Sequence, residues 1–251
     1  MCSPEAILFD LWGTLIDSVS FDPQLGNAVL LARSENPRGA TLVDVQDLGG
    51  RLVTATIPRE EESALEFTQG ALFRILSDSF GLQFRIPLPD LEWEFWDASL
   101  KVKLRPGAVE MLDDLRLRGI RSCVISNSSF GASTIERELE RQGISKHFEF
   151  VISSADYGIR KPDALIFEAA LRRMGVSAGK SWFVGDNVGY DVIGAQQAGL
   201  FPIAYNAHAP VPTSVAEYAA IRHWRELTGL LKMVRDQPAP YSVPDRPKAP
   251  A

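Results

Sequence analysis

Short apolar runs that stop at a polar residue recur along this chain. In the first, residues 7–9 lead into Asp10, and Gly13 and Thr14 then turn the chain. Such a run is typical of a buried strand whose carboxyl end lies at Asp10. A carboxylate in that position costs free energy unless it has a partner or a chemical role. We therefore treat Asp10 as a candidate functional residue.

From residue 104 onward, strand-like and helix-like segments alternate. The predicted strands cover residues 123–125, 148–152, 182–184 and 201–205, and the predicted helices run to residue 115, to residue 142, from 164 to 174, and to residue 198. Repeated units of this length require a parallel sheet with helices on both faces, a Rossmann-like α/β core. Ligands of such sheets bind beyond the carboxyl ends of the strands, which is where Asp10, Ser126 and Asp186 fall.

After residue 17 the apolar positions change to helical spacing. Helices are expected over residues 65–80 and 91–100, and the three glutamates at 60–62 suit the negatively charged first turn of a helix. Residues 43–57 fit either a helix or a strand, because two adjacent glycines interrupt them.

This change of rhythm divides the chain into three parts. We expect a core made of residues 1–17 and 102–235, with a mostly helical insertion, residues 18–101, after the first strand. Residues 236–251 contain five prolines and are expected to form a flexible tail.

Composition narrows the class of protein. The chain of 251 residues has 45% hydrophobic and 23% charged residues, as ordinary globular proteins do. Its net charge of -6, without any basic run, argues against nucleic-acid binding. The two cysteines, Cys2 and Cys123, cannot form a disulfide framework, and no apolar run is long enough to span a bilayer. We expect a cytoplasmic protein that binds neither nucleic acid nor membrane.

The polar residues at the strand ends suggest a reaction. Asp186 and Asp191 lie five residues apart and would converge with Asp10, and three carboxylates so close repel one another unless a cation joins them. Mg²⁺ is the cation that such oxygen ligands favour. With Lys161 as a positive charge and the Ser126 hydroxyl as an anion-binding group, the set suits phosphoryl transfer through an aspartyl intermediate.

Four short motifs in this order resemble those of the haloacid dehalogenase-like hydrolase superfamily. They are residues 10–14, Ser126 and Asn127, Lys161 and Pro162, and residues 185–191. The resemblance covers residues 5–17 and 104–206, and the helical insertion is similar to the C1 cap of that superfamily.

This resemblance implies a role for each motif. Asp10 would be the nucleophile that becomes a phosphoaspartate, and Lys161 and Ser126 would hold the phosphoryl oxygens. The implied metal ligands are Asp10, the backbone carbonyl of Trp12, Asp186 and, directly or through the outer shell, Asp191. The expected catalytic residues are Asp10 and Lys161, and the expected substrate-binding residues are Trp12, Thr14, Ser126 and Asn127.

One position departs from the pattern. Phosphatases of this superfamily usually carry a second aspartate two residues after the nucleophile as the general acid and base, and here that residue is Trp12. Because an indole does not exchange protons near neutral pH, the loss amounts to about 10²- to 10⁴-fold in rate unless another group takes over this role.

Three functions remain open. The first is a Mg²⁺-dependent phosphatase for a small phosphorylated metabolite. The second is a 2-haloacid dehalogenase, since those enzymes carry an aromatic residue at the place of Trp12. The third is a non-catalytic binding member. We favour the phosphatase because Asp186 and Asp191 would repel an anionic haloacid. The substrate, and whether the protein is a monomer or a homodimer, stay open.

Overall fold

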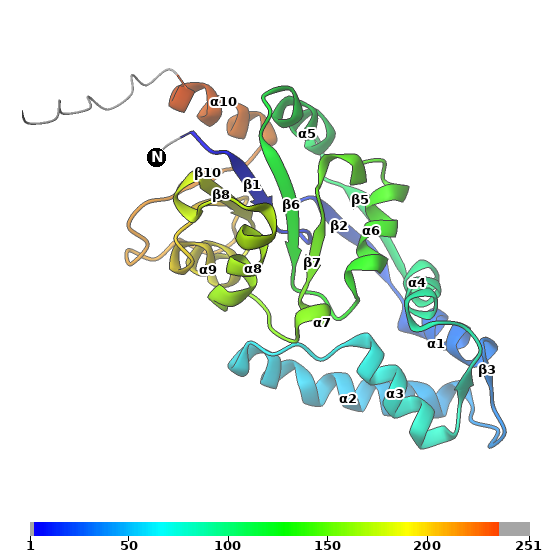
Figure 1. The fold of residues 1–251 in the computed structure, drawn as a ribbon. Helices are drawn as coiled ribbons and strands as arrows, with labels where there is room; N and C mark the ends of the chain where they lie inside the picture. The colour runs from blue at the N-terminus through cyan, green and yellow to red at the C-terminus, as the bar shows by residue number, and fades with distance from the viewer. Residues whose placement is uncertain (1–2, 236–251) are drawn as a thin grey trace, which may run out of the picture.

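A computed structural model describes residues 3–235, so the predicted tail lies outside the described residues. Its centre is a six-stranded parallel sheet in the order β10-β9-β8-β1-β6-β7 (Figure 1). The strands are β1 (Ala6–Phe9), β6 (Arg121–Ser126), β7 (Val151–Ser153), β8 (Ser181–Gly185), β9 (Phe201–Tyr205) and β10 (Ala219–Ile221). The predicted strand over 148–152 is shorter than expected, and β10 extends the sheet beyond the strand predicted to be the last.

Successive residues of the central strands point to opposite faces of the sheet, and both faces are buried. In β1, Ile7 and Phe9 join one hydrophobic cluster with the helices over residues 108–117, 132–141 and 224–235, while Leu8 joins another with the helices over residues 164–174 and 194–197. This burial on both sides explains the unbroken apolar runs in the sequence. The predicted α/β core is confirmed.

The helices of the core are α5 (Ala108–Leu117), α6 (Ala132–Arg141), α7 (Ser154–Tyr157), α8 (Ala164–Met174), the π-helical segment η3 (Val188–Ile193), α9 (Gly194–Gln197) and α10 (Trp224–Arg235). Four of them, α5, α6, α8 and α9, end close to the predicted positions, and the others had no predicted bounds. In α8 both ends are set by local chemistry, because the Asp163 side chain caps the first turn and Gly175 takes the left-handed conformation after the last.

The insertion after the first strand is mostly helical, as predicted, but its details differ. It contains β2 (Ile16–Phe21), α1 (Pro23–Ala32), β3 (Ser34–Glu35), α2 (Leu42–Ser63), α3 (Gln69–Phe80), β4 (Gln83–Phe84), α4 (Leu88–Ser99) and β5 (Leu100–Leu104). The helical spacing expected after residue 17 was wrong for β2, which pairs with the distant strand β5. No described helix has the length and apolar character needed to cross a membrane.

The structure settles one open alternative about α2 and corrects one expectation. The helix runs through Gly49 and Gly50, because its other residues and the Thr41 capping box outweigh the cost of two glycines. The glutamates at 60–62 lie in the last turn of α2, not in a first turn. Negative charges at this end of a helix interact unfavourably with the helix dipole. Glu60 is paired with Arg160, a residue of the core.

The inserted helices contact the core at two places. Helix α4 packs on α6, where Trp96 Nε1 donates a hydrogen bond to Glu138 Oε2 at 2.9 Å. The segment between α2 and α3 contacts the loops beyond the sheet. There the backbone N–H of Gln69 donates a hydrogen bond to the carbonyl of Ser129 at 2.7 Å. In Figure 1, α2 and α3 lie beyond the end of β7, next to α7. The insertion therefore borders the carboxyl edge of the sheet.

Candidate active site

Three adjacent strands bring the predicted residues to one edge of the sheet. β1 lies between β8 and β6, with Phe9 level with Val184 and Val124. Asp10 directly follows β1, Ser126 ends β6, and Asp186 follows β8. Residues more than 100 positions apart are thus neighbours because parallel strands present their carboxyl ends on the same side.

The carboxylates of Asp10, Asp186 and Asp191 converge. One oxygen of each lies within 4.8 Å of the others. Two glycines make room for this approach: a Cβ on Gly13 would lie 2.3 Å from Asp186 Oδ2, and one on Gly185 would lie 2.3 Å from Asp191 Oδ2. Gly13 also has a φ of +71°, a conformation that favours glycine.

Lys161 joins two of the three carboxylates. Its Nζ donates hydrogen bonds to Asp10 Oδ1 at 2.6 Å and to Asp191 Oδ1 at 2.7 Å. The Asn127 side chain fixes the backbone that carries it, because Oδ1 accepts from the Lys161 amide at 2.8 Å and Nδ2 donates to the Lys161 carbonyl at 2.9 Å. Asn127 therefore holds the lysine in place as well as bordering the site.

Burial makes this cluster electrostatically costly. It raises the pKa of Asp10 to about 7, against the lowering effect of Lys161 and with a further rise from Asp191. Burial and Asp191 likewise raise the pKa of Asp186. Although burial alone would lower it, the two ion pairs raise the pKa of Lys161, so the lysine stays charged. Three carboxylates face one ammonium, which leaves two negative charges uncompensated.

The donor set fits a divalent cation with oxygen ligands. Asp191 Oδ2 accepts a hydrogen bond from the Asn187 amide at 2.9 Å, so both of its oxygens are engaged. The Asp186 carboxylate forms no ion pair, and the Trp12 carbonyl accepts no hydrogen bond, within residues 3–235. These two groups are therefore the most available to an ion, and a charge of +2 would balance the cluster.

Three further residues were predicted to bind substrate, and their surroundings differ: Thr14, Ser126 and Trp12. Thr14 Oγ1 donates to Asp10 Oδ2 at 2.9 Å and so orients that carboxylate. The Ser126 hydroxyl is fully buried and has no hydrogen-bond partner among the described residues. A buried hydroxyl of this kind costs free energy unless a ligand satisfies it. Trp12 is half-buried, and its ring centroid lies 5.4 Å from that of Trp96 in α4.

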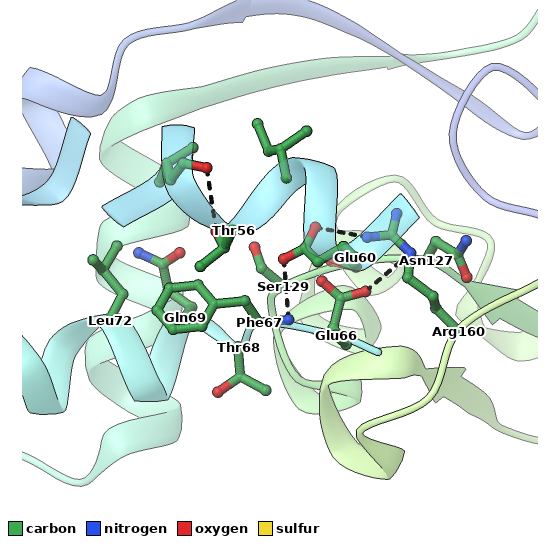
Figure 2. A pocket seen from close by; sticks show the side chains of 13 residues that line it. Thr56, Glu60, Glu66, Phe67, Thr68, Gln69, Leu72, Asn127, Ser129 and Arg160 are labelled. Atoms are coloured by element: carbon green, nitrogen blue, oxygen red, sulfur yellow. Dashed lines mark hydrogen bonds and ion pairs between the residues drawn. The ribbon is translucent and has the colours of Figure 1, made fainter. Parts of the chain in front are cut away.

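A cavity of about 240 Å³ opens beside this cluster, between the insertion and the core (Figure 2). It is lined by Asn127, Gln69 and Arg160, among others. Arg160 Nη1 lies 2.7 Å from Glu60 Oε2, and its Nε lies 3.7 Å from Glu66 Oε2. Sequence reasoning missed these three charged residues, although the position of Arg160 next to Lys161 was a signal that it would lie near the site.

Comparison with known proteins gives a family and several relatives. The family model of haloacid dehalogenase-like hydrolases matches residues 4–199. A glyceraldehyde 3-phosphate phosphatase of Methanothermobacter thermautotrophicus is 39% identical over 41% of this chain and 44% of its own. A phosphoglycolate phosphatase of Pseudomonas fluorescens is 28% identical over 83% of this chain and 73% of its own. The chain spans about half the length of the first curated relatives it matches.

A solved structure from the dehalogenase branch is also similar. The 2-haloacid dehalogenase of Pseudomonas syringae has a TM-score of 0.61 and 25% identity, and the match covers 93% of this chain and 99% of that one. The comparisons therefore include both phosphatases and a dehalogenase, and the chemistry of the site has to decide between them.

Proposed function

The chain belongs to the haloacid dehalogenase-like hydrolases, and from this we propose that it is a Mg²⁺-dependent phosphatase for a small phosphorylated metabolite, with Asp10 as the nucleophile. The convergence of three carboxylates, only two of which pair with the single lysine, carries the proposal. Two uncompensated negative charges in a buried site favour a divalent cation, and a bound cation in turn attracts a phosphate ester.

The same charges argue against dehalogenation. A haloacid is an anion, and without a metal it would meet the surplus negative charge of Asp186. Dehalogenase chemistry stays the second candidate because Trp12 is aromatic and a 2-haloacid dehalogenase is among the similar structures. Two relatives found by sequence, from Methanothermobacter thermautotrophicus and Pseudomonas fluorescens, are named as phosphatases, which supports the first candidate.

In the proposed mechanism each residue has one task. A carboxylate oxygen of Asp10 attacks phosphorus, the bond to the leaving oxygen breaks, and water then hydrolyses the aspartyl phosphate. Thr14 orients the Asp10 carboxylate. Lys161 and Ser126 bind the transferred phosphoryl oxygens, and Asn127 positions Lys161. Asp10, Asp186 and the Trp12 carbonyl would hold Mg²⁺, with Asp191 as a ligand or outer-shell support, and the ion would stabilise negative charge on the phosphoryl group.

Trp12 limits which esters react quickly. It cannot protonate the leaving oxygen, so the leaving group has to depart as an anion. Acyl and aryl phosphates meet this condition, whereas simple alkyl phosphates do not. The indole is half-buried and packs on Trp96, and in the proposed mechanism it contacts an apolar or aromatic part of the leaving group.

The proposal extends to the domains, the cellular location and the oligomeric state. We propose that residues 18–101 are a cap that closes over a core of residues 1–17 and 102–235. We also propose that the protein acts in the cytoplasm, as a monomer or a homodimer.

Hydrolysis of p-nitrophenyl phosphate during a Mg²⁺ titration tests this function, because the acidic leaving group does not need the missing acid. We expect metal-dependent turnover that Asp10→Asn abolishes, while the control Asp78→Asn, at an exposed position of α3, retains it. Halide release from a 2-haloacid without turnover of the ester would establish dehalogenation. Neither activity in the folded protein would establish a binding role.

A further inference from the structure

A second cavity continues the one beside the active site into the insertion. It measures about 390 Å³ and shares Val53, Gln69 and Leu72 with the first. The first cavity includes Asn127, whose amide is bonded to the backbone of Lys161. The two cavities, here called the distal subsite, are lined from Asn127 and Arg160, the sequence neighbours of Ser126 and Lys161, to residues of α1, α2 and α4. A leaving group attached to the transferred phosphate would extend into this space.

The charges that line the distal subsite are already paired. Among its described lining residues only Glu60, Glu66 and Arg160 are charged. Figure 2 shows both carboxylates directed at the single guanidinium. Glu66 is also buried and accepts a hydrogen bond from Ser154 Oγ at 2.6 Å. One cation faces two carboxylates, so the lining carries a net formal negative charge, although the Nε–H of Arg160 has no hydrogen-bond partner among the described residues.

Two buried amide side chains in the same space have no partner. Asn27 and Gln69 are 8% and 7% exposed, and both line the distal subsite. Neither side chain forms a hydrogen bond within the part of the chain that the structure describes. Their polar atoms are accessible from the cavity rather than sealed in the interior, so a ligand there can form the hydrogen bonds that the protein does not supply. Apolar side chains, Phe21, Leu72 and Phe95 among them, form the remaining walls.

We propose that the distal subsite binds an uncharged, hydrogen-bonding leaving group with an apolar or aromatic body, and that it rejects a leaving group that carries a carboxylate. The inference rests on the proposed phosphatase function and names its substrate class. Asn27 and Gln69 bind the polar edge of the leaving group, and Glu60 and Glu66 set the selection against anions. Phosphate esters of hydroxy acids should therefore be poor substrates, because their leaving group carries a carboxylate.

Two aryl phosphates of nearly the same shape test the proposal. In 4-carbamoylphenyl phosphate the distal group is a neutral amide, and in 4-carboxyphenyl phosphate it is a carboxylate. We expect kcat/KM to favour the amide by about tenfold or more, because the carboxylate meets like charge in a partly buried site. The ratio should fall at high salt if charge is the cause.

Variants of the native enzyme identify the responsible groups. Glu60→Gln removes one paired carboxylate and leaves the guanidinium of Arg160 available. The ratio of kcat/KM for the amide ester to that for the carboxylate ester should therefore fall to about one or below. Glu66→Gln should act in the same direction if the first variant does not fold. Glu62→Gln, an exposed neighbour in the same helix turn, is the matched control and should keep the preference. Gln69→Met and Asn27→Leu should each lower kcat/KM for the amide substrate by about three- to tenfold, and by a smaller factor for phenyl phosphate, which has no polar edge.

The outcomes separate this inference from the proposed function. Equal rates for the two substrates, or a preference for the carboxylate in the native enzyme, would overturn the inference while leaving the phosphatase intact. If neither ester is hydrolysed, the proposed function fails. Calorimetric affinities of the two esters for the native protein in Mg²⁺ then decide the inference, because tighter binding of the amide supports it and equal binding refutes it.

Discussion

Replacement of Asp186 by asparagine is expected to have opposite effects on stability with and without Mg²⁺. Asp186 faces two carboxylates and one ammonium, so in metal-free protein its charge is on balance repelled. With the ion bound, the same charge becomes a ligand. One substitution therefore tests both the repulsion and the metal site.

The structure sets the size of the effect. At 4.8 Å, two like charges repel by about 3 kcal/mol when the effective dielectric constant is about 20. One of the two repulsions is offset by Lys161, and solvent reaches Asp186, so we expect about 1–2 kcal/mol of added stability in the metal-free variant. Saturating Mg²⁺, at about 100 times its dissociation constant, stabilises the native protein by about 2.7 kcal/mol. The variant should gain much less.

Thermal and urea unfolding of the native protein and Asp186→Asn, in EDTA and in Mg²⁺, measure these differences at neutral pH. Each kcal/mol corresponds to a shift in Tm of about 2–4 °C for a chain of this size. Asp78→Asn serves as the control and should follow the native protein in both conditions. A destabilised metal-free variant would refute the repulsion argument. Equal stabilisation of both proteins by Mg²⁺ would show that Asp186 is not a ligand.

Two further predictions concern leaving groups and pH. The rate should rise steeply with the acidity of the leaving group, and Trp12→Asp should raise the rate on alkyl phosphates by about tenfold or more by restoring a proton donor; a flat dependence in steady-state assays would contradict this role of Trp12. The stability of metal-free protein should fall as the pH rises from about 4 to about 7, because the folded state binds the Asp10 proton more tightly than the unfolded chain does. Urea unfolding across this range measures the slope, which Asp10→Asn should reduce, and an unchanged slope in that variant would count against the raised pKa of Asp10.

Local patterns in the sequence determined most of the core. The apolar runs of the central strands and the helix over residues 164–174 follow from burial on both faces and from capping residues, which act within a few positions of one another. The same runs identified Asp10, Ser126 and Asp186 as residues at strand ends. The chemical types and spacing of these residues were enough to suggest a cation site, because charge repulsion does not depend on the details of packing.

Only the tertiary structure decided how distant segments meet. Strand β2 exists because it pairs with β5, and no local period marks it. Lys161 reaches Asp10 across 151 positions, and Arg160 reaches Glu60 across 100. Such contacts depend on the order of strands in the sheet and on the docking of α2 and α3 over its edge. The sequence by itself therefore determined the candidate groups of the site, whereas tertiary packing decided their pairing and the charges that line the two cavities, because these arise between segments that share no local pattern.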